Sequence, residues 1–257
     1  LVFDALNVFM RHYAANPTMG ENGQLAGGIV GFMKNIRLLC EKINPESAII
    51  VWEGGGSIRR RSIFKEYKGG RKPQKMNRYY DDDIPDSSQN RNYQIAMLVK
   101  LLNFVPVKQV YVGECEADDV IGYLVRNRFN EKRIVIVSSD KDYYQLLSED
   151  VLQWSPGQKK FIDPDIVLEK FGISVENFCT ARAIIGDQSD NIPGIKGAGF
   201  KTLAKRFPEL SKAEFVSVSD IIKLAEIRRE SCKLKIFDRI VEGSDLIHRN
   251  WKLMYLD

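Results

Sequence analysis

Four short apolar runs, rich in β-branched residues, recur in the N-terminal part of the chain. The runs are Leu1–Phe3, Ser47–Trp52, Val107–Val112 and Arg133–Val137. Each has the length and composition of a buried β-strand. Segments with helical spacing of apolar residues separate them, including Leu25, Ile29, Phe32, Ile36, Leu39 and Ile43, and later Val120, Ile121, Leu124 and Val125. Strands that alternate with helices predict an α/β fold, in which a mainly parallel sheet is flanked by helices.

Acidic residues follow three of these predicted strands. Asp4 and Glu53 come directly after the first two runs, and Asp140 follows the fourth after two serines. In open α/β sheets, ligands bind beyond the carboxyl ends of the strands. The sequence therefore places a functional site at that edge of the sheet.

The 257 residues are enough for one large domain or two moderate ones. A glycine-rich and basic segment at about residues 54–92 interrupts the sheet pattern, and we expect it to be a long, partly flexible insertion. From residue 181 the pattern is helical, apart from the turn-rich residues 191–199. We therefore expect an α/β domain over residues 1–180 and a smaller helical region over residues 181–257.

Composition excludes several classes of site and location. The chain has two histidines, His12 and His248, which excludes a histidine-rich zinc centre. Its four cysteines form no CxxC pair, a pattern typical of reduced thiols inside a cell. No apolar run approaches the roughly 18 residues of a membrane span. An intracellular protein of the cytoplasm or nucleoid is expected, with no membrane partner, and a phage origin is compatible with this.

Positive charge is concentrated in one window, residues 58–78. It holds one acid, Glu66, and nine cations, a net of +8, so the rest of this +4 chain carries −4. The cations are Arg59, Arg60, Arg61, Lys65, Lys68, Arg71, Lys72, Lys75 and Arg78. A solvated charged helix is the alternative, but such helices usually mix both signs. The window therefore favours contact with nucleic acid.

Nine acids occupy positions that the fold would bring together. They are Asp4, Glu53, Glu116, Asp118, Asp119, Asp140, Asp142, Asp187 and Asp190. One or two of them are explained by helix capping, but four separate groups along one α/β chain are not. Clustered carboxylates oppose each other's ionisation and need cations. Hard oxygen ligands select Mg²⁺ or Mn²⁺, and a pair of such ions can activate water against a phosphodiester.

Together these segments resemble the 5′-nuclease and flap endonuclease superfamily, including the 5′-nuclease domain of bacterial DNA polymerase I and phage 5′-exonuclease/ribonuclease H proteins. The matching motifs are Phe3-Asp4, Glu116-Ala-Asp-Asp119, Ser139-Asp-Lys-Asp142 and Gly186-Asp-Gln-Ser-Asp-Asn-Ile-Pro-Gly194. They cover roughly four fifths of the chain.

The resemblance implies a division of the acids between two metal ions. One ion would take Asp4, Glu116 and Asp118, the other Asp142, Asp187 and Asp190, with Asp119 and Asp140 between them. The cofactor implied is two Mg²⁺, which Mn²⁺ can replace. The chain departs from the family in two places, Ala5 for glycine and Glu53 for aspartate. The longer Glu53 either binds a metal directly or displaces a water ligand.

The resemblance also implies roles for the basic window, which the family folds into a helical arch for single-stranded 5′ ends. Arg60 and Lys68 match cations near the scissile phosphate, where they stabilise charge on the phosphoryl oxygens. Tyr67 either stacks on a base or packs under the arch. Arg11 either binds DNA or pairs with a carboxylate. The other candidates for nucleic-acid binding in this part are Arg59, Arg61, Lys65, Arg71 and Lys72.

Residues 191–202 resemble the hairpin of a helix-hairpin-helix element. Gly194, Gly197 and Gly199 would let backbone amides approach a phosphate, and the alternative is a tight turn. Lys196 and Lys201 would add phosphate contacts.

The expected function is hydrolysis of phosphodiester bonds in DNA with 5′ flaps, nicks or RNA primers, during replication or repair. No polymerase domain follows in the chain, so we expect a stand-alone, monomeric enzyme. Three alternatives stay open: a relative that binds branched DNA without cutting it, a phosphatase with Asp4 as nucleophile, and a smaller PIN-type ribonuclease. A phosphatase usually has an acid two residues on, where this chain has Leu6.

Overall fold

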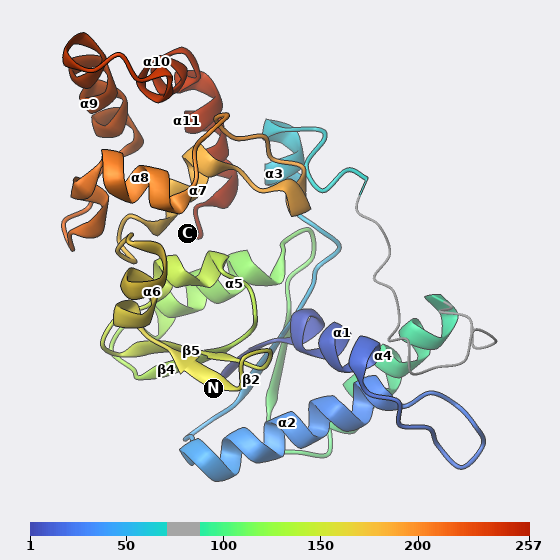
Figure 1. Ribbon diagram of the computed structural model, residues 1–257. Helices are drawn as coiled ribbons and strands as arrows, with labels where there is room; N and C mark the ends of the chain where they lie inside the picture. The colour runs from blue at the N-terminus through green and yellow to red at the C-terminus, as the bar shows by residue number, and fades with distance from the viewer. Residues whose placement is uncertain (71–87) are drawn as a thin grey trace.

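A six-stranded sheet forms the centre of the structure, a computed structural model that describes residues 1–70 and 88–257 (Figure 1). The strands are β1 (Val2–Asp4), β2 (Ile49–Trp52), β3 (Lys108–Tyr111), β4 (Ile134–Val137), β5 (Val151–Ser155) and β6 (Lys160–Ile162). Their order is β3-β2-β1-β4-β5-β6, and β6 alone is antiparallel to its neighbour. The mainly parallel α/β sheet predicted from the sequence is confirmed.

The alternation of side chains along each strand divides the core between the two faces of the sheet. Phe3 and Ile50 belong to a cluster on one face, whereas Val2 and Ile49 belong to a cluster on the other. The first face is covered by α1 (Ala5–Ala15), α2 (Gly27–Ile43) and α4 (Ser88–Leu102). Against the second lie α5 (Ala117–Tyr123) and the π-helical turn η1 (Leu124–Arg128). Successive strand residues point to opposite faces, so both faces of this sheet are apolar.

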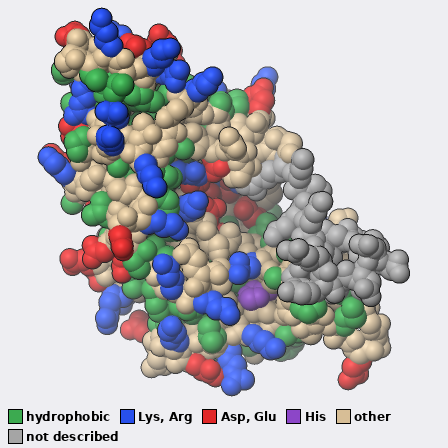
Figure 2. Space-filling view, in the orientation of Figure 1, with side chains coloured by type: hydrophobic (Ala, Val, Ile, Leu, Met, Phe, Trp, Pro, Cys, Tyr) green, Lys and Arg blue, Asp and Glu red, His purple; other side chains and the backbone are tan. Residues whose placement is uncertain are grey.

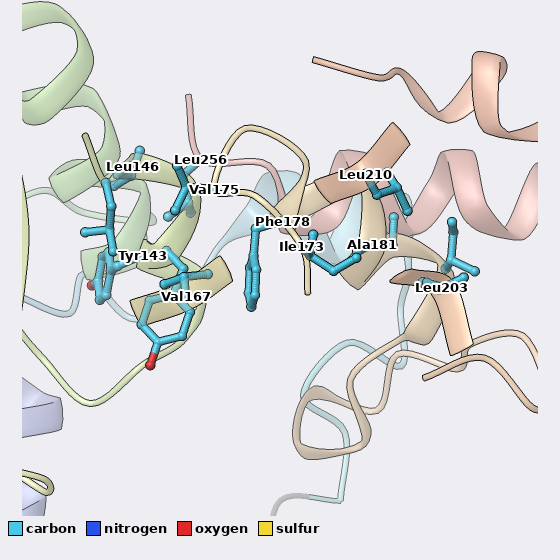
Figure 3. Close-up of a cluster of buried hydrophobic side chains, with 14 of the residues drawn as sticks. Tyr143, Leu146, Val167, Ile173, Val175, Phe178, Ala181, Leu203, Leu210 and Leu256 are labelled. Atoms are coloured by element: carbon cyan, nitrogen blue, oxygen red, sulfur yellow. The ribbon is translucent and has the colours of Figure 1, made fainter. Parts of the chain in front are cut away.

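The C-terminal helices extend the second core cluster away from the sheet. They are α6 (Pro164–Phe171), α7 (Phe178–Ile185), α8 (Phe200–Arg206), α9 (Val218–Ser231), α10 (Lys235–Glu242) and α11 (Ser244–Met254). Figure 3 shows this cluster from Tyr143 through Phe178 to Leu203, with Leu256 of the C-terminal segment packed into it. The core therefore continues past residue 180, and the predicted domain boundary there stays a prediction.

The predicted insertion at residues 54–92 is described only in part. It begins with a short helix, α3 (Ile58–Ile63), which Ser57 caps by accepting a hydrogen bond from the Arg60 amide at 3.1 Å. Helix α4 already runs from Ser88, and the bounds of the insertion stay a prediction. Arg71 and Lys72 lie outside the described residues, as do residues 73–87 of the predicted insertion. Among the residues that are described, no helix is long and apolar enough to cross a membrane.

Candidate active site

Four carboxylates from different parts of the chain line one cavity of about 530 Å³. Asp4 ends β1, Glu53 follows β2 and Asp140 follows β4, while Asp118 lies in the first turn of α5. The parallel strands bring their carboxyl ends to one edge, as the sequence predicted. Lys68 and Arg11 line the same cavity. Figure 2 shows acidic side chains in a hollow between the C-terminal helices above and the part that contains the sheet below.

Asp4 is the most enclosed of these carboxylates, with 8% of its surface exposed. Its Oδ1 accepts a hydrogen bond from the amide of Asn7, and its Oδ2 accepts from Ser138 Oγ at 3.1 Å and Tyr143 Oη at 3.0 Å. Burial raises the pKa of Asp4 to about 7, and the neighbouring charge of Glu53 adds to the shift. Burial also raises the pKa of Glu53. These two carboxylates therefore lack full compensation for their charge.

A second group of acids surrounds the buried guanidinium of Arg60, whose exposed fraction is 1%. Arg60 donates to Glu116, to Asp118 at 2.9 Å and to Asp119 at 2.7 Å. Its Nε donates to the carbonyl of Leu253 at 2.8 Å, near the end of α11. Arg60 is not among the residues that line the cavity. In this conformation it neutralises carboxylates, and a phosphate contact would require its guanidinium to leave them.

Lys68 and Tyr67 reach the same acids from the segment after α3. The Nζ of Lys68 donates to Glu116 Oε2 at 2.6 Å, and the Tyr67 hydroxyl donates to it at 2.8 Å. Burial opposes ionisation of Glu116, but Lys68 and Arg60 outweigh it, so the pKa of Glu116 is lowered. Tyr67 also donates to Asp190 at 3.3 Å and is 6% exposed. The prediction that Tyr67 binds nucleic acid by stacking does not fit so buried a ring, and the packing alternative does.

Asp142 and Asp187 form a third group, joined by Arg182 of α7. One guanidinium nitrogen of Arg182 donates to Asp142 at 2.9 Å and to Asp187 at 2.5 Å. Burial raises the pKa of Asp142 to about 7, with Arg182 opposing it. At Asp187 the arginine outweighs burial, and the pKa is lowered. Arg182 was not among the residues predicted from the sequence, although it is a lone charge within the apolar helix Phe178–Ile185.

The described lining of the cavity offers four carboxylates, with the amide of Asn7 and the hydroxyl of Ser139, and contains no histidine or cysteine, which suits Mg²⁺ or Mn²⁺ rather than zinc. Within residues 1–70 and 88–257, however, no group of three or more Asp, Glu, His or Cys side chains is arranged to hold a metal ion. The chain's own cations occupy part of the set, since Arg60 and Lys68 pair with one group and Arg182 with another. The residues fit divalent ions chemically, and Asp4, Glu53, Asp118 and Asp140 line the cavity.

The remaining basic candidates are distributed differently. Arg11 lies at the cavity, and its guanidinium donates to Gly157 O at 3.5 Å. Arg59 contacts Asp119 at 3.2 Å, and Arg61 donates to a backbone carbonyl at 3.2 Å. Lys65 is exposed, as are Lys196 and Lys201.

The predicted hairpin lies between α7 and α8, with α8 starting at Phe200. At Gly194 an added Cβ would lie 1.8 Å from the carbonyl oxygen of Ile185, so close packing requires glycine there. Gly197 has a φ of 87°, which also favours glycine. Gly199 precedes α8 as its N-cap. A phosphate-binding role for this segment stays a prediction.

A family model for the 5′-3′ exonuclease, N-terminal resolvase-like domain, matches residues 1–172. The chain belongs to this family. This chain is 29% identical over 197 residues to a 5′-3′ exonuclease of Aquifex aeolicus, and the match covers 76% of this chain and 63% of that protein. It is 32% identical over 232 residues to a DNA polymerase I of Deinococcus radiodurans, covering 90% of this chain and 22% of the polymerase. The resemblance predicted from the motifs is confirmed.

The fold of the exonuclease-family chain is similar to that of a flap endonuclease of bacteriophage T5, solved as a complex with DNA and metal ions. The TM-score is 0.75 at 22% identity, and the match covers 99% of this chain and 88% of that one. At this identity the likeness concerns the fold. The chain spans less than two thirds of the length of the exonuclease and polymerase relatives described above.

Proposed function

We propose that this chain is a divalent-metal-dependent 5′-nuclease, which hydrolyses phosphodiester bonds to leave a 5′-phosphate and a 3′-hydroxyl. The observation that carries the proposal is the cavity lined by Asp4, Glu53, Asp118 and Asp140 beside Lys68. Relatives named 5′-3′ exonuclease and DNA polymerase I support it, as does a similarly folded flap endonuclease bound to DNA and metal ions. The proposed substrates are 5′ flaps, nicked duplex and RNA primers, in DNA replication or repair.

Two Mg²⁺ ions are the proposed cofactor, with Mn²⁺ as a substitute. The residues that would hold them are the carboxylates of the cavity together with acids now paired to Lys68, Arg60 and Arg182. When bound, such ions activate a water molecule and stabilise the leaving oxygen of a phosphodiester. Burial makes some of these carboxylates costly to ionise, Asp4 above all, and a bound cation would stabilise their charged form.

The chain's own residues supply orientation and positive charge. Ser138 and Tyr143 hold one oxygen of Asp4 and leave its carboxylate facing the cavity. Lys68 lines the cavity while bound to Glu116, so a small rotation of its flexible side chain would bring its ammonium to a phosphoryl oxygen. Such a cation stabilises the charge that develops there in the transition state. Arg11 would bind a further phosphate along the same cavity.

End-labelled flap, nicked, gapped and RNA-primed duplexes, each incubated with Mg²⁺, Mn²⁺ or EDTA, test the proposal directly. We expect cleavage with either ion, none in EDTA, and products that carry a 5′-phosphate. Asp118→Asn should abolish turnover and leave duplex binding intact or tighter, because it removes charge that repels phosphate. Asp150→Asn is the matched control, since Asp150 is an exposed acid outside the cavity lining.

Near wild-type cleavage by Asp118→Asn in Mg²⁺ would overturn the assignment of that residue. Tight binding of branched DNA by the wild-type chain, with no cleavage in either ion, would replace the proposal with the alternative of a non-catalytic DNA-binding relative.

A further inference from the structure

Gln153 lies behind the cavity, fully buried in the middle of β5. Its neighbour Trp154 packs in the core on the α1–α2 face of the sheet, so the Gln153 side chain points to the opposite face. There its Nε2 donates two hydrogen bonds, to the carbonyl of Ser138 at 2.7 Å and to that of Asp140 at 2.8 Å. Both carbonyls belong to the loop that follows β4 and carries Asp140 to the cavity.

The same loop is held from the cavity side by its amides. The peptide between Ser138 and Ser139 is fixed at both ends, because its carbonyl accepts from Gln153 and its N–H donates to Asn7 Oδ1 at 3.0 Å. A trans peptide directs these two groups in opposite directions, so the two partners determine the orientation of the peptide plane. The amide of Asp140 then donates to Ser138 Oγ at 3.1 Å, and that hydroxyl donates to Asp4.

The choice of glutamine at this position needs an explanation. Its Oε1 is buried and has no hydrogen-bond partner among the residues that the structure describes. A buried amide oxygen without a partner destabilises a fold, and an apolar side chain of similar length would avoid that cost. What an apolar side chain could not do is donate to two carbonyls at once, since that requires the two hydrogens of an amide nitrogen.

We propose that Gln153 is a positioning residue, which fixes the loop from Ser138 to Asp140 so that the Asp140 carboxylate is held at the cavity ready to bind a divalent ion. The inference rests on the proposed metal-dependent function. Groups behind the direct ligands commonly change metal affinity by about 10–100-fold when they are removed. Without the two donors, the loop carbonyls would be free to rotate, and Asp140 would no longer be held beside Asp4.

The test measures Mn²⁺ affinity of the full chain without nucleic acid, by titration calorimetry or by the EPR signal of free Mn²⁺. Gln153→Met keeps the length of the side chain and removes both donors. Gln94→Met is the matched control, because Gln94 is also a buried glutamine with one satisfied and one unpartnered side-chain polar atom, but it accepts from the amide of Gly28 in the first turn of α2. Melting temperatures of both variants show whether each is folded in the assay.

We expect Gln153→Met to lower Mn²⁺ affinity by about 10-fold or more, while Gln94→Met keeps the affinity of the wild type. In cleavage assays over a range of DNA concentrations, Gln153→Met should lower kcat at sub-saturating Mn²⁺ and leave KM for DNA unchanged. If Gln153→Met does not fold, Gln153→Glu, which keeps the shape of the side chain and loses at least one donor hydrogen, should show the same loss.

Wild-type Mn²⁺ affinity in a folded Gln153 variant would overturn the inference and leave the proposed function standing. An equal loss in the Gln94 and Gln153 variants would also overturn it, since any buried amide would then have the same effect. A wild-type chain that binds no Mn²⁺ would overturn the proposed function itself, and the inference with it.

Discussion

Replacing Arg60 by methionine should destabilise the fold strongly, and more so at high pH than at low pH. The guanidinium is 1% exposed, and it compensates Glu116, Asp118 and Asp119, whose side chains are 3%, 20% and 19% exposed. Removing one partner of a buried ion pair typically costs about 3–5 kcal/mol, because the other charge stays buried without compensation. A chain of this kind has about 5–15 kcal/mol of stability in all.

The pH dependence follows from the carboxylates that Arg60 leaves behind. The pKa of Asp119 is already raised to about 6, mainly by burial. Without Arg60 the folded-state pKa values of its partners should rise further above their unfolded values of about 4. A carboxylate with a raised folded pKa loses stability as the pH rises above its unfolded pKa, so the deficit should be smallest below about pH 4 and larger at pH 8.

Thermal or urea unfolding in EDTA measures the effect. For a domain of this size, about 3–5 kcal/mol corresponds to a fall in Tm of roughly 6–20 °C. Arg61→Met is the control: Arg61 is exposed, and a surface substitution should change stability by about 0.5 kcal/mol or less. A variant whose Tm at pH 8 equals the wild-type value, but whose cleavage rate is lower, would refute a stabilising role for Arg60 among the buried carboxylates. It would favour direct contact between Arg60 and the phosphate.

Three further measurements test other parts of the site. In EDTA the wild-type chain should lose roughly a few kcal/mol of stability as the pH rises from about 4 to about 7, because the pKa values of Asp4 and Asp142 are raised to about 7. Saturating Mg²⁺ should reduce this dependence of stability on pH. A stability that does not change with pH in EDTA would contradict the prediction. Arg182→Met should lower Tm in EDTA by leaving Asp142 and Asp187 unpaired, with partial recovery in Mn²⁺, and no recovery would mean that no cation takes its place. Lys196→Ala should weaken duplex binding and reduce its salt slope by about one unit at unchanged kcat and Tm, whereas unaltered affinity would remove the hairpin from the binding surface.

The parts of the fold that the sequence predicted correctly are those that a local pattern determines. β2 and β4 are uninterrupted apolar runs rich in β-branched residues, and α2 has apolar residues at helical spacing. β5 was missed because the buried Gln153 interrupts its apolar pattern, and the reason for that glutamine is its contact with the loop after β4. The helical start at Ala5 was also missed, because its cap is Asp4, which the sequence analysis had assigned to the functional site. Local patterns are ambiguous where one residue serves both the fold and the site.

The positions of the acids could be expected from the sequence, whereas the partners of the cations could not. The reason is that the cations contact residues far away along the chain. The acids follow strands of one parallel sheet, so the fold class alone brings Asp4, Glu53 and Asp140 to the same edge. The environment of Arg60 depends instead on α11, whose Leu253 carbonyl is 193 residues away in the sequence. No local pattern predicts such a contact, and the family resemblance suggested a phosphate as the partner of Arg60.

The placement of these cations bears on where metal ions would bind. Arg60, together with Lys68, outweighs burial at Glu116, and Arg182 does so at Asp187, so the pKa values of these two carboxylates are lowered and they stay charged in the folded chain. Asp4 accepts hydrogen bonds from the backbone amide of Asn7 and from the uncharged side chains of Ser138 and Tyr143. Its raised pKa is the consequence, because a buried carboxylate without a cation prefers its proton. A divalent ion that replaces this proton would gain most in affinity beside Asp4, and its binding should therefore release protons to the buffer near pH 7. Calorimetric titration of Mn²⁺ in buffers of different ionisation enthalpy would reveal that release, and its absence would mean that the ion binds away from Asp4.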